Sequence, residues 1–182
     1  MKFTLALMSE LEDALQHGAP ERRVELLRRI TDLFLSDANR LNEAQVGVFD
    51  EILTHLAHRI EERVLAQISL KFAPVRNAPR NMISLLASDA NISVAGPVLA
   101  QSDRLAENDL IEIAKSKGQT HLLAIAIRAH LSEAITDVLI ERGDRRVVGK
   151  LARNAGARFS QDGYKSIVNR AEGDDELTEN LG

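Results

Sequence analysis

The second half of the chain repeats itself with a period of about 26–30 residues. Three segments open alike, with a large apolar residue, then Ser or Ala, then Glu or Gln. They are LAENDLIEIAKSKG from Leu105, LSEAITDVLIERG from Leu131 and FSQDGYKSIVNRAEG from Phe159. Each then carries apolar residues at helical spacing and closes on a glycine. Repeats of this length are typical of stacked supersecondary units, so this feature limits the fold more than any other.

A second helical segment follows each of the closing glycines, Gly118, Gly143 and Gly173. When these segments are aligned on their glycines, Leu122 falls opposite Val147. A glycine directly after a helix is the usual left-handed cap, so we expect these glycines to end the first helix of each unit in that conformation. Each unit is therefore predicted to be a pair of helices.

The helix pairs divide the chain into units. We place longer N-terminal helices in 1–72 and repeat units at 78–104, 105–130, 131–158 and 159–182, the last one incomplete. Stacked helix pairs are typical of α-solenoids of the HEAT or armadillo kind. The 182 residues are thus predicted to form one all-α domain, an α-solenoid with a right-handed superhelix.

The end of the sequence cuts the last unit short. Its second helix has room for only the nine residues from Asp174 to Gly182. We expect either a fragment of a longer protein or an array without a terminal cap. In both cases the apolar edge at Leu177 and Leu181 is expected to be frayed, or covered by a partner or a second copy.

Three residue types predict where helices begin or bend. Ser132 and Ser160 can cap the helices that follow them, whereas Ala106 has no side-chain acceptor. Gly96 and Pro97 lie inside an expected second helix. Proline in a helix removes a backbone hydrogen bond and clashes with the preceding turn, so we expect a kink or a break there.

Composition limits the function classes. The chain has no cysteine, which excludes disulfides, thiol catalysis and cysteine-ligated metal sites and suits the cytoplasm. Its net charge of −4 gives no global attraction to nucleic acid or anionic membranes. No stretch approaches the ~18 apolar residues of a membrane span, and the first residues lack the apolar run of a signal peptide. We expect a cytoplasmic protein without membrane association.

Much of the chain resembles a known family. The resemblance is carried by LLAIAIRAHLSEAITDVLIERGDRRVVGKLARNAGARFSQDGYKSIVNRA and by DANISVAGPVLAQSDRLAENDLIEIA before it. These segments are similar to domain-of-unknown-function family 2336, which is bacterial and chiefly alphaproteobacterial. The resemblance covers roughly 20–180 and is strongest over 85–172. It implies a HEAT-like helical array and, because members are usually longer, favours a fragment; it implies no activity, cofactor or catalytic residue.

The only close pair of histidines is His55 and His58. With Glu51 and Glu62 they form the pattern E-x3-H-x2-H-x3-E, which on one helix lies within about 60°. These are ligand types for a divalent metal. Because Glu51 and Glu62 are too far apart on a straight helix to share an ion, we interpret the stripe as a solvated polar face. We expect no metal and no cofactor.

Motifs for enzymatic chemistry do not occur in the sequence. It contains no cysteine nucleophile, no G-x-S-x-G and neither of the glycine-rich phosphate-binding patterns. His121 precedes the apolar run LLAIAIRA and is interpreted as a core or capping histidine. We predict a protein that is not an enzyme, with a metal-dependent enzyme at His55 and His58 as a second alternative.

Basic side chains gather in the unit 131–158. They are Arg142, Arg145, Arg146, Lys150, Arg153 and Arg158. Arg146, Lys150 and Arg153 are spaced i, i+4, i+7, so they form one stripe on a helix. Because equivalent helices of a solenoid line its concave binding surface, this stripe is the predicted site for an anion or an acidic partner. A solvated face with local salt bridges is the other interpretation.

The repeat and the basic stripe together predict a non-enzymatic scaffold that binds another protein. Nucleic-acid binding through 142–158, as in the HEAT-like architecture of some DNA glycosylases, is the alternative. The negative net charge, the absence of Trp and the lack of basic residues interleaved with aromatic ones disfavour it.

Overall fold

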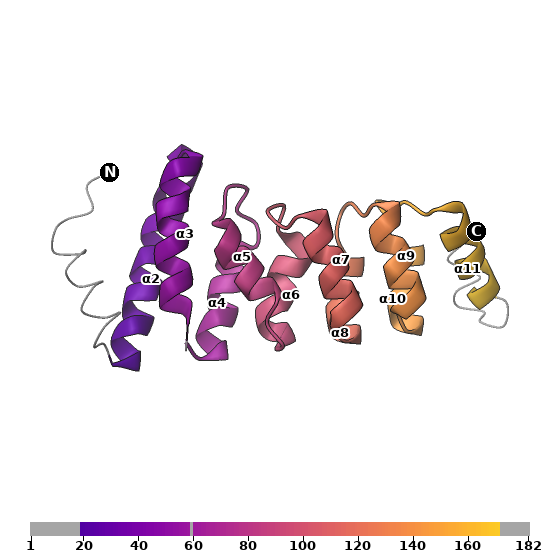
Figure 1. Cartoon of the computed structure of the whole chain (residues 1–182), viewed down its shortest axis with the longest axis horizontal. Coiled ribbons are helices and arrows are strands. Elements are labelled where there is room, and N and C mark those ends of the chain that lie inside the picture. The colour runs from indigo at the N-terminus through magenta and orange to yellow at the C-terminus, as the bar shows by residue number, and fades with distance from the viewer. Residues whose placement is uncertain (1–18, 59, 172–182) are drawn as a thin grey trace.

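The computed structural model describes residues 19–58 and 60–171, and this part of the chain is all-helical (Figure 1). Its only β-structure is a single parallel bridge between Leu131 and Ala157. The all-α prediction is confirmed for these residues. The expected Leu177 and Leu181 edge, Gly173 and the second helix of the last unit lie outside them.

The helices follow one another along the long axis in chain order (Figure 1). The first four elements are α2 (Pro20–Asp37), the 3₁₀ helix η1 (Ala38–Arg40), α3 (Glu43–Ala57) and α4 (Glu62–Phe72). Then come α5 (Arg80–Ala87), α6 (Ile92–Gln101), α7 (Glu107–Ser116), α8 (Gln119–Ala126), α9 (Glu133–Arg142), α10 (Arg145–Ala152) and α11 (Gln161–Ala171). None of the helices described is long and apolar enough to cross a membrane.

The helices pack in two rows. In the second-helix row, α4 contacts α6, α6 contacts α8, and α8 contacts α10. In the first-helix row, α3 contacts α5, α7 contacts α9, and α9 contacts α11. The pairs α5–α6, α7–α8 and α9–α10 also contact each other, so each pair contributes one helix to each row.

Apolar side chains between the rows form one continuous core. At the N-terminal end Phe34 of α2 meets Phe49 and Phe72 edge-to-face, with ring centroids 5.3 and 5.7 Å apart. Farther along, Leu122 and Ile125 of α8 are fully buried between the neighbouring pairs. Burial of this apolar area is the main force holding the helices together.

The four helices of the second-helix row share one burial pattern when counted from their N-caps, Glu61, Asn91, Gly118 and Asp144. Positions three, four and seven after the N-cap are buried in every one. This register places Leu122 opposite Val148, so the predicted match to Val147 is wrong by one residue. The error arose because Gly143 precedes the N-cap of α10, whereas Gly118 is itself the N-cap of α8.

The prediction of left-handed glycine caps is wrong at both glycines that the structure describes. Gly118 has φ −86° and Gly143 has φ −70°, both in extended backbone. Gly143 is required for space instead, because a Cβ there would lie 2.7 Å from the Val147 Cγ1 atom and closer still to the Leu139 carbonyl oxygen. The helix ends are satisfied differently, by side chains of the following unit.

Polar side chains of one unit donate hydrogen bonds to carbonyl oxygens at the helix C-termini of the unit before it. We call these contacts the cross-unit caps. In the first-helix row they run from Lys117 Nζ to Ser88 O (2.5 Å), from Arg142 Nη1 to Ala114 O and Lys117 O, and from Arg170 Nη1 to Gly143 O (2.9 Å). Cationic donors also suit the negative end of the helix dipole.

The second-helix row has the same kind of cap at one equivalent position. Arg128 donates to Leu99 O at 2.6 Å and to Ser102 O at 2.8 Å. Asn154, at the same place one unit later, donates to Ala126 O at 2.9 Å and Arg128 O at 2.8 Å. Burial lowers the pKa of Arg128, and the charge of nearby Asp103 opposes that shift.

A buried carboxylate joins the N-terminal helices to the pairs that follow. Asp50 of α3 is 5% exposed and accepts backbone hydrogen bonds from Asn81 and Met82, both at 2.8 Å. These N–H groups belong to the first turn of α5, whose N-cap residue Pro79 supplies no side-chain acceptor. Asp50 therefore caps α5 from another helix.

The predicted helix starts are confirmed. Of the expected kink or break at Gly96 and Pro97, the break is wrong. Ser132 accepts from Ile135 N and Ser160 from Gly163 N, while Ala106 makes no side-chain cap. Helix α6 continues through Pro97. Because Pro97 lies only six residues into the helix, its missing N–H removes one early hydrogen bond and leaves the following turn intact.

Replacing Asp50 with alanine should lower the free energy of unfolding by about 2–3 kcal/mol, because two N–H groups in the first turn of α5, one buried and one part-buried, lose a charged acceptor. Urea denaturation followed by circular dichroism measures this. Glu51→Ala, at the exposed neighbour, is the control and should change stability by less than about 0.5 kcal/mol. Equal effects of the two variants would contradict the capping role of Asp50.

Replacing Ile125 with alanine should cost about 2–5 kcal/mol, because the side chain is fully buried between the two rows. Leu123, on the same helix, is only partly buried. Leu123→Ala should therefore cost less than about 2 kcal/mol. A larger loss for Leu123→Ala than for Ile125→Ala in the same denaturation experiment would mean that α8 is rotated.

Candidate functional site

The basic stripe lies on the outward side of α10. Asp144 caps this helix by accepting from Val147 N at 3.0 Å. Val147, Val148 and Leu151 are fully buried, which leaves the opposite side of α10 to solvent. Arg146 and Lys150 are exposed there, and no side chain among residues 19–58 and 60–171 pairs with either of them.

The six predicted basic residues do not form one site. Arg145 and Arg153 are exposed next to Arg146 and Lys150 but take part in further interactions. Arg142 points the other way, where its guanidinium caps α7 through the Ala114 and Lys117 carbonyls. Arg142 thus has a structural contact of its own, and its role in partner binding stays a prediction. Arg158 lies elsewhere, in a groove between two units.

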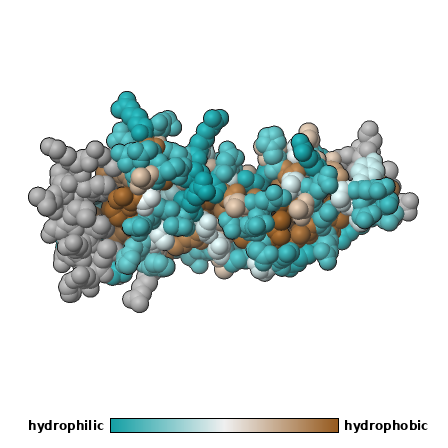
Figure 2. Space-filling model, turned by 45° about the horizontal axis from the view of Figure 1, so that its top comes forward, coloured by the Kyte–Doolittle hydropathy of each residue, from teal (hydrophilic) through white to brown (hydrophobic). Residues whose placement is uncertain are grey.

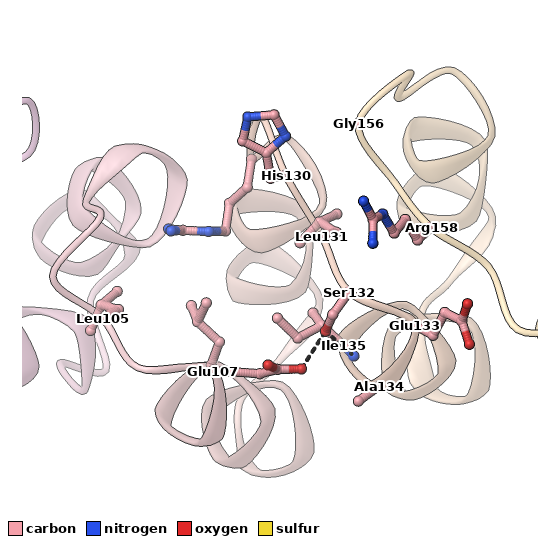
Figure 3. A pocket seen from close by; sticks show the side chains of 12 residues that line it. Leu105, Glu107, His130, Leu131, Ser132, Glu133, Ala134, Ile135, Gly156 and Arg158 are labelled. Atoms are coloured by element: carbon pink, nitrogen blue, oxygen red, sulfur yellow. Dashed lines mark hydrogen bonds between the residues drawn. The ribbon is translucent and has the colours of Figure 1, made fainter.

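This groove has a volume of about 580 Å³ and lies between the starts of α7 and α9 (Figure 3). Ser132 Oγ donates to Glu107 and accepts from Ile135 N, so it serves the N-terminus of α9. Figure 3 shows the His130 ring pointing away from Ser132, with Arg158 on the other side of Ser132 from Glu107. Ser132 thus has no imidazole base beside it, and the groove has charges of both signs.

The four residues considered for a metal do not share one helix. Helix α3 ends at Ala57, His58 is its extended C-cap, and Glu62 begins α4. The single-helix stripe from Glu51 to Glu62 is therefore wrong. The rings of His55 and His58 lie 6.4 Å apart, and no group of three or more potential metal ligands occurs among the residues described.

The interpretation of His121 as a core residue is confirmed. It is 4% exposed, and its Nε2 atom lies 2.9 Å from the carbonyl oxygen of Asp89. This contact joins α8 to the connection before α6. His121 therefore belongs to the packing between units.

Comparison with known protein families agrees with the resemblance seen in the sequence. The model of a family described as Uncharacterised protein conserved in bacteria (DUF2336) matches residues 94–182. The chain is thus similar to this family over residues 94–182. No curated protein and no solved structure matches the chain.

The DUF2336 segment includes all six basic residues of the unit 131–158. It does not include the four residues of the histidine pattern, Glu51, His55, His58 and Glu62. The segment also contains the cross-unit caps made by Arg128, Arg142, Asn154 and Arg170. The basic stripe and the contacts that position it thus belong to the same family segment.

Sequence reasoning missed Arg128 and Asn154, which fix the positions of successive second helices. A signal for them exists. Each stands ten residues after an N-cap, Gly118 for Arg128 and Asp144 for Asn154, and each is followed by a small residue. The one-residue slip of the sequence alignment hid this equivalence.

The structure predicts opposite behaviour for two neighbouring arginines. Arg142→Met keeps the aliphatic stem but leaves the α7 carbonyls without their cap, so the free energy of unfolding should fall by about 1–3 kcal/mol. Arg146→Met removes only an exposed charge and should change it by less than about 0.5 kcal/mol. Thermal and urea denaturation of both variants checks this. Similar losses would show that the two arginines do not differ in role.

Proposed function

We propose that this chain is a HEAT- or armadillo-like α-solenoid with a right-handed superhelix, which works as a non-enzymatic scaffold for a protein partner in the bacterial cytoplasm. The observation that carries the proposal is the regular packing of α4, α6, α8 and α10 side by side in one register. A row of equivalent helices offers a long surface on which each helix presents the same positions.

The outward positions of this row support a binding role. We define the second-helix face as the residues two, six and nine positions after each N-cap. They are Arg63, Gln67 and Leu70; Ser93, Pro97 and Ala100; Thr120, Ala124 and Ile127; and Arg146, Lys150 and Arg153. All of them are exposed or only partly buried. Large apolar side chains are exposed on this face at Leu70 (64%) and Ile127 (47%), as is common in binding surfaces.

The face seen in Figure 2 also favours discrete contacts over a continuous apolar interface. Figure 2 shows a mainly hydrophilic face, on which apolar atoms gather in separate patches along the molecule. Separate patches with polar surroundings are typical of non-obligate protein interfaces. A scaffold that binds and releases its partner fits this surface better than a permanent subunit does.

Affinity capture with the full chain tests the scaffold function. The tagged protein is incubated with a lysate of its source bacterium at about 0.15 M salt, with and without nuclease. We expect a discrete protein in near-stoichiometric amount that survives nuclease treatment and is lost when the bait is unfolded. Retention of nucleic acid alone, weakening with salt by a slope of about −0.9 per phosphate, would replace the scaffold by a nucleic-acid-binding protein.

A further inference from the structure

From α6 to α10 the helices of the two rows differ sharply in charge. Helices α6, α8 and α10 contain no Asp or Glu. Helices α7 and α9 of the other row carry three carboxylates each: Glu107, Asp109 and Glu112, and Glu133, Asp137 and Glu141. The net charge of −4 therefore does not describe the second-helix face, whose twelve residues include no Asp or Glu. Electrostatic complementarity on the scale of a binding surface depends on this local distribution.

The second-helix face changes in character along the row. At the ninth position after the N-cap the residues are Leu70, Ala100 and Ile127 on α4, α6 and α8, and then Arg153 on α10. At the sixth position Pro97 and Ala124 are followed by Lys150. The face is thus small and apolar over α6 and α8 and basic over α10.

Two cations at the basic end of this face, Arg146 and Lys150, are not used by the fold. The cationic groups that hold units together, on Lys117, Arg128, Arg142 and Arg170, belong to the cross-unit caps. Arg146 and Lys150 make no such contact and remain exposed on the outward side of α10. Their charges stand beside the apolar positions of α8, because α8 and α10 pack against each other.

We propose that the second-helix face binds an acidic segment of a protein partner, with apolar side chains of that segment seated over α6 and α8 and its carboxylates paired with Arg146 and Lys150. The inference rests on the proposed scaffold function and names the surface and the partner's chemistry. Charge complementarity carries it, because carboxylates of the partner meet two unpaired cations and no carboxylate from α6, α8 or α10. The exposed Ile127 provides the apolar anchor next to them.

The face favours a peptide over a nucleic acid. A phosphate backbone is bound along a succession of cationic side chains, and α6 and α8 supply none on this face. Unstacked bases need aromatic platforms, and none of the twelve residues of the second-helix face is aromatic. Small apolar positions beside two cations match a segment that alternates apolar and acidic residues.

A selection experiment with the full chain tests this inference. A phage-displayed library of random 16-residue peptides is selected on the immobilised protein at about 0.15 M salt. The affinities of the enriched peptides are then measured for the parent protein, for Arg146→Glu/Lys150→Glu and for Lys115→Glu/Lys165→Glu. Both double variants change the net charge equally, but Lys115 and Lys165 lie on α7 and α11 in the other row. Thermal melts confirm that each variant folds.

We expect enriched peptides with net negative charge and at least two large apolar residues. Arg146→Glu/Lys150→Glu should weaken their binding by about tenfold or more, because attraction becomes repulsion at both positions. Ile127→Asp should weaken it comparably, and Lys115→Glu/Lys165→Glu by less than about twofold.

Three results would overturn the inference: no enrichment, enriched peptides that are neutral or basic, or equal weakening by both double variants. Stronger binding of a fluorescein-labelled 20-base-pair DNA duplex that displaces the peptides would overturn it as well. The scaffold function fails separately. If a captured protein partner binds Arg146→Glu/Lys150→Glu as well as the parent, the scaffold stands and the assigned face is wrong.

Discussion

The structure depends on hydrogen bonds that one unit donates to the helix ends of the unit before it. Each helix leaves its last carbonyl groups without partners inside the helix, and burial between units would make them costly. Lys117, Arg128, Arg142, Asn154 and Arg170 supply the missing donors across 25 to 29 residues of sequence. Because each cap reaches the preceding unit, it fixes the distance and the register between neighbours, and apolar burial then stabilises that register.

This way of ending helices accounts for the backbone between them. A left-handed glycine would satisfy the last carbonyls locally and turn the chain sharply. With donors arriving from the next unit, the two-residue connections at 117–118 and 143–144 remain extended and lead directly into the second helix. Close approach then becomes the constraint, and Gly143 meets it by leaving space for Val147 and for the end of α9.

Features governed by local spacing could be predicted from the sequence, and features governed by contacts between units could not. Helical periodicity gave the all-α fold, and short-range capping gave the roles of Ser132 and Ser160. The i, i+4, i+7 spacing predicted that Arg146 and Lys150 share one face of a helix, and both are exposed on α10. Arg142 has the same side chain as Arg146 and stands four residues before it. Its partner carbonyl nevertheless belongs to Ala114, in another unit. The predicted stripe from Glu51 to Glu62 was wrong, because its helical spacing was extended past Ala57, where α3 ends.

Some cations of this protein hold the fold together, and others remain unpaired on its surface. The net charge of the chain does not distinguish these two groups. The cations of the cross-unit caps donate hydrogen bonds to carbonyl oxygens, and Arg104 forms an ion pair with Glu43 at 2.9 Å. These cations therefore do not offer their charge to a binding partner. Among helices α6 to α10, by contrast, the carboxylates lie only on α7 and α9. The net charge of the whole molecule therefore argues against an anionic ligand. Over α6, α8 and α10, in contrast, the local charge favours one. A surface that must recognise an acidic segment needs only a few unpaired cations, provided that no carboxylate stands near enough to neutralise them.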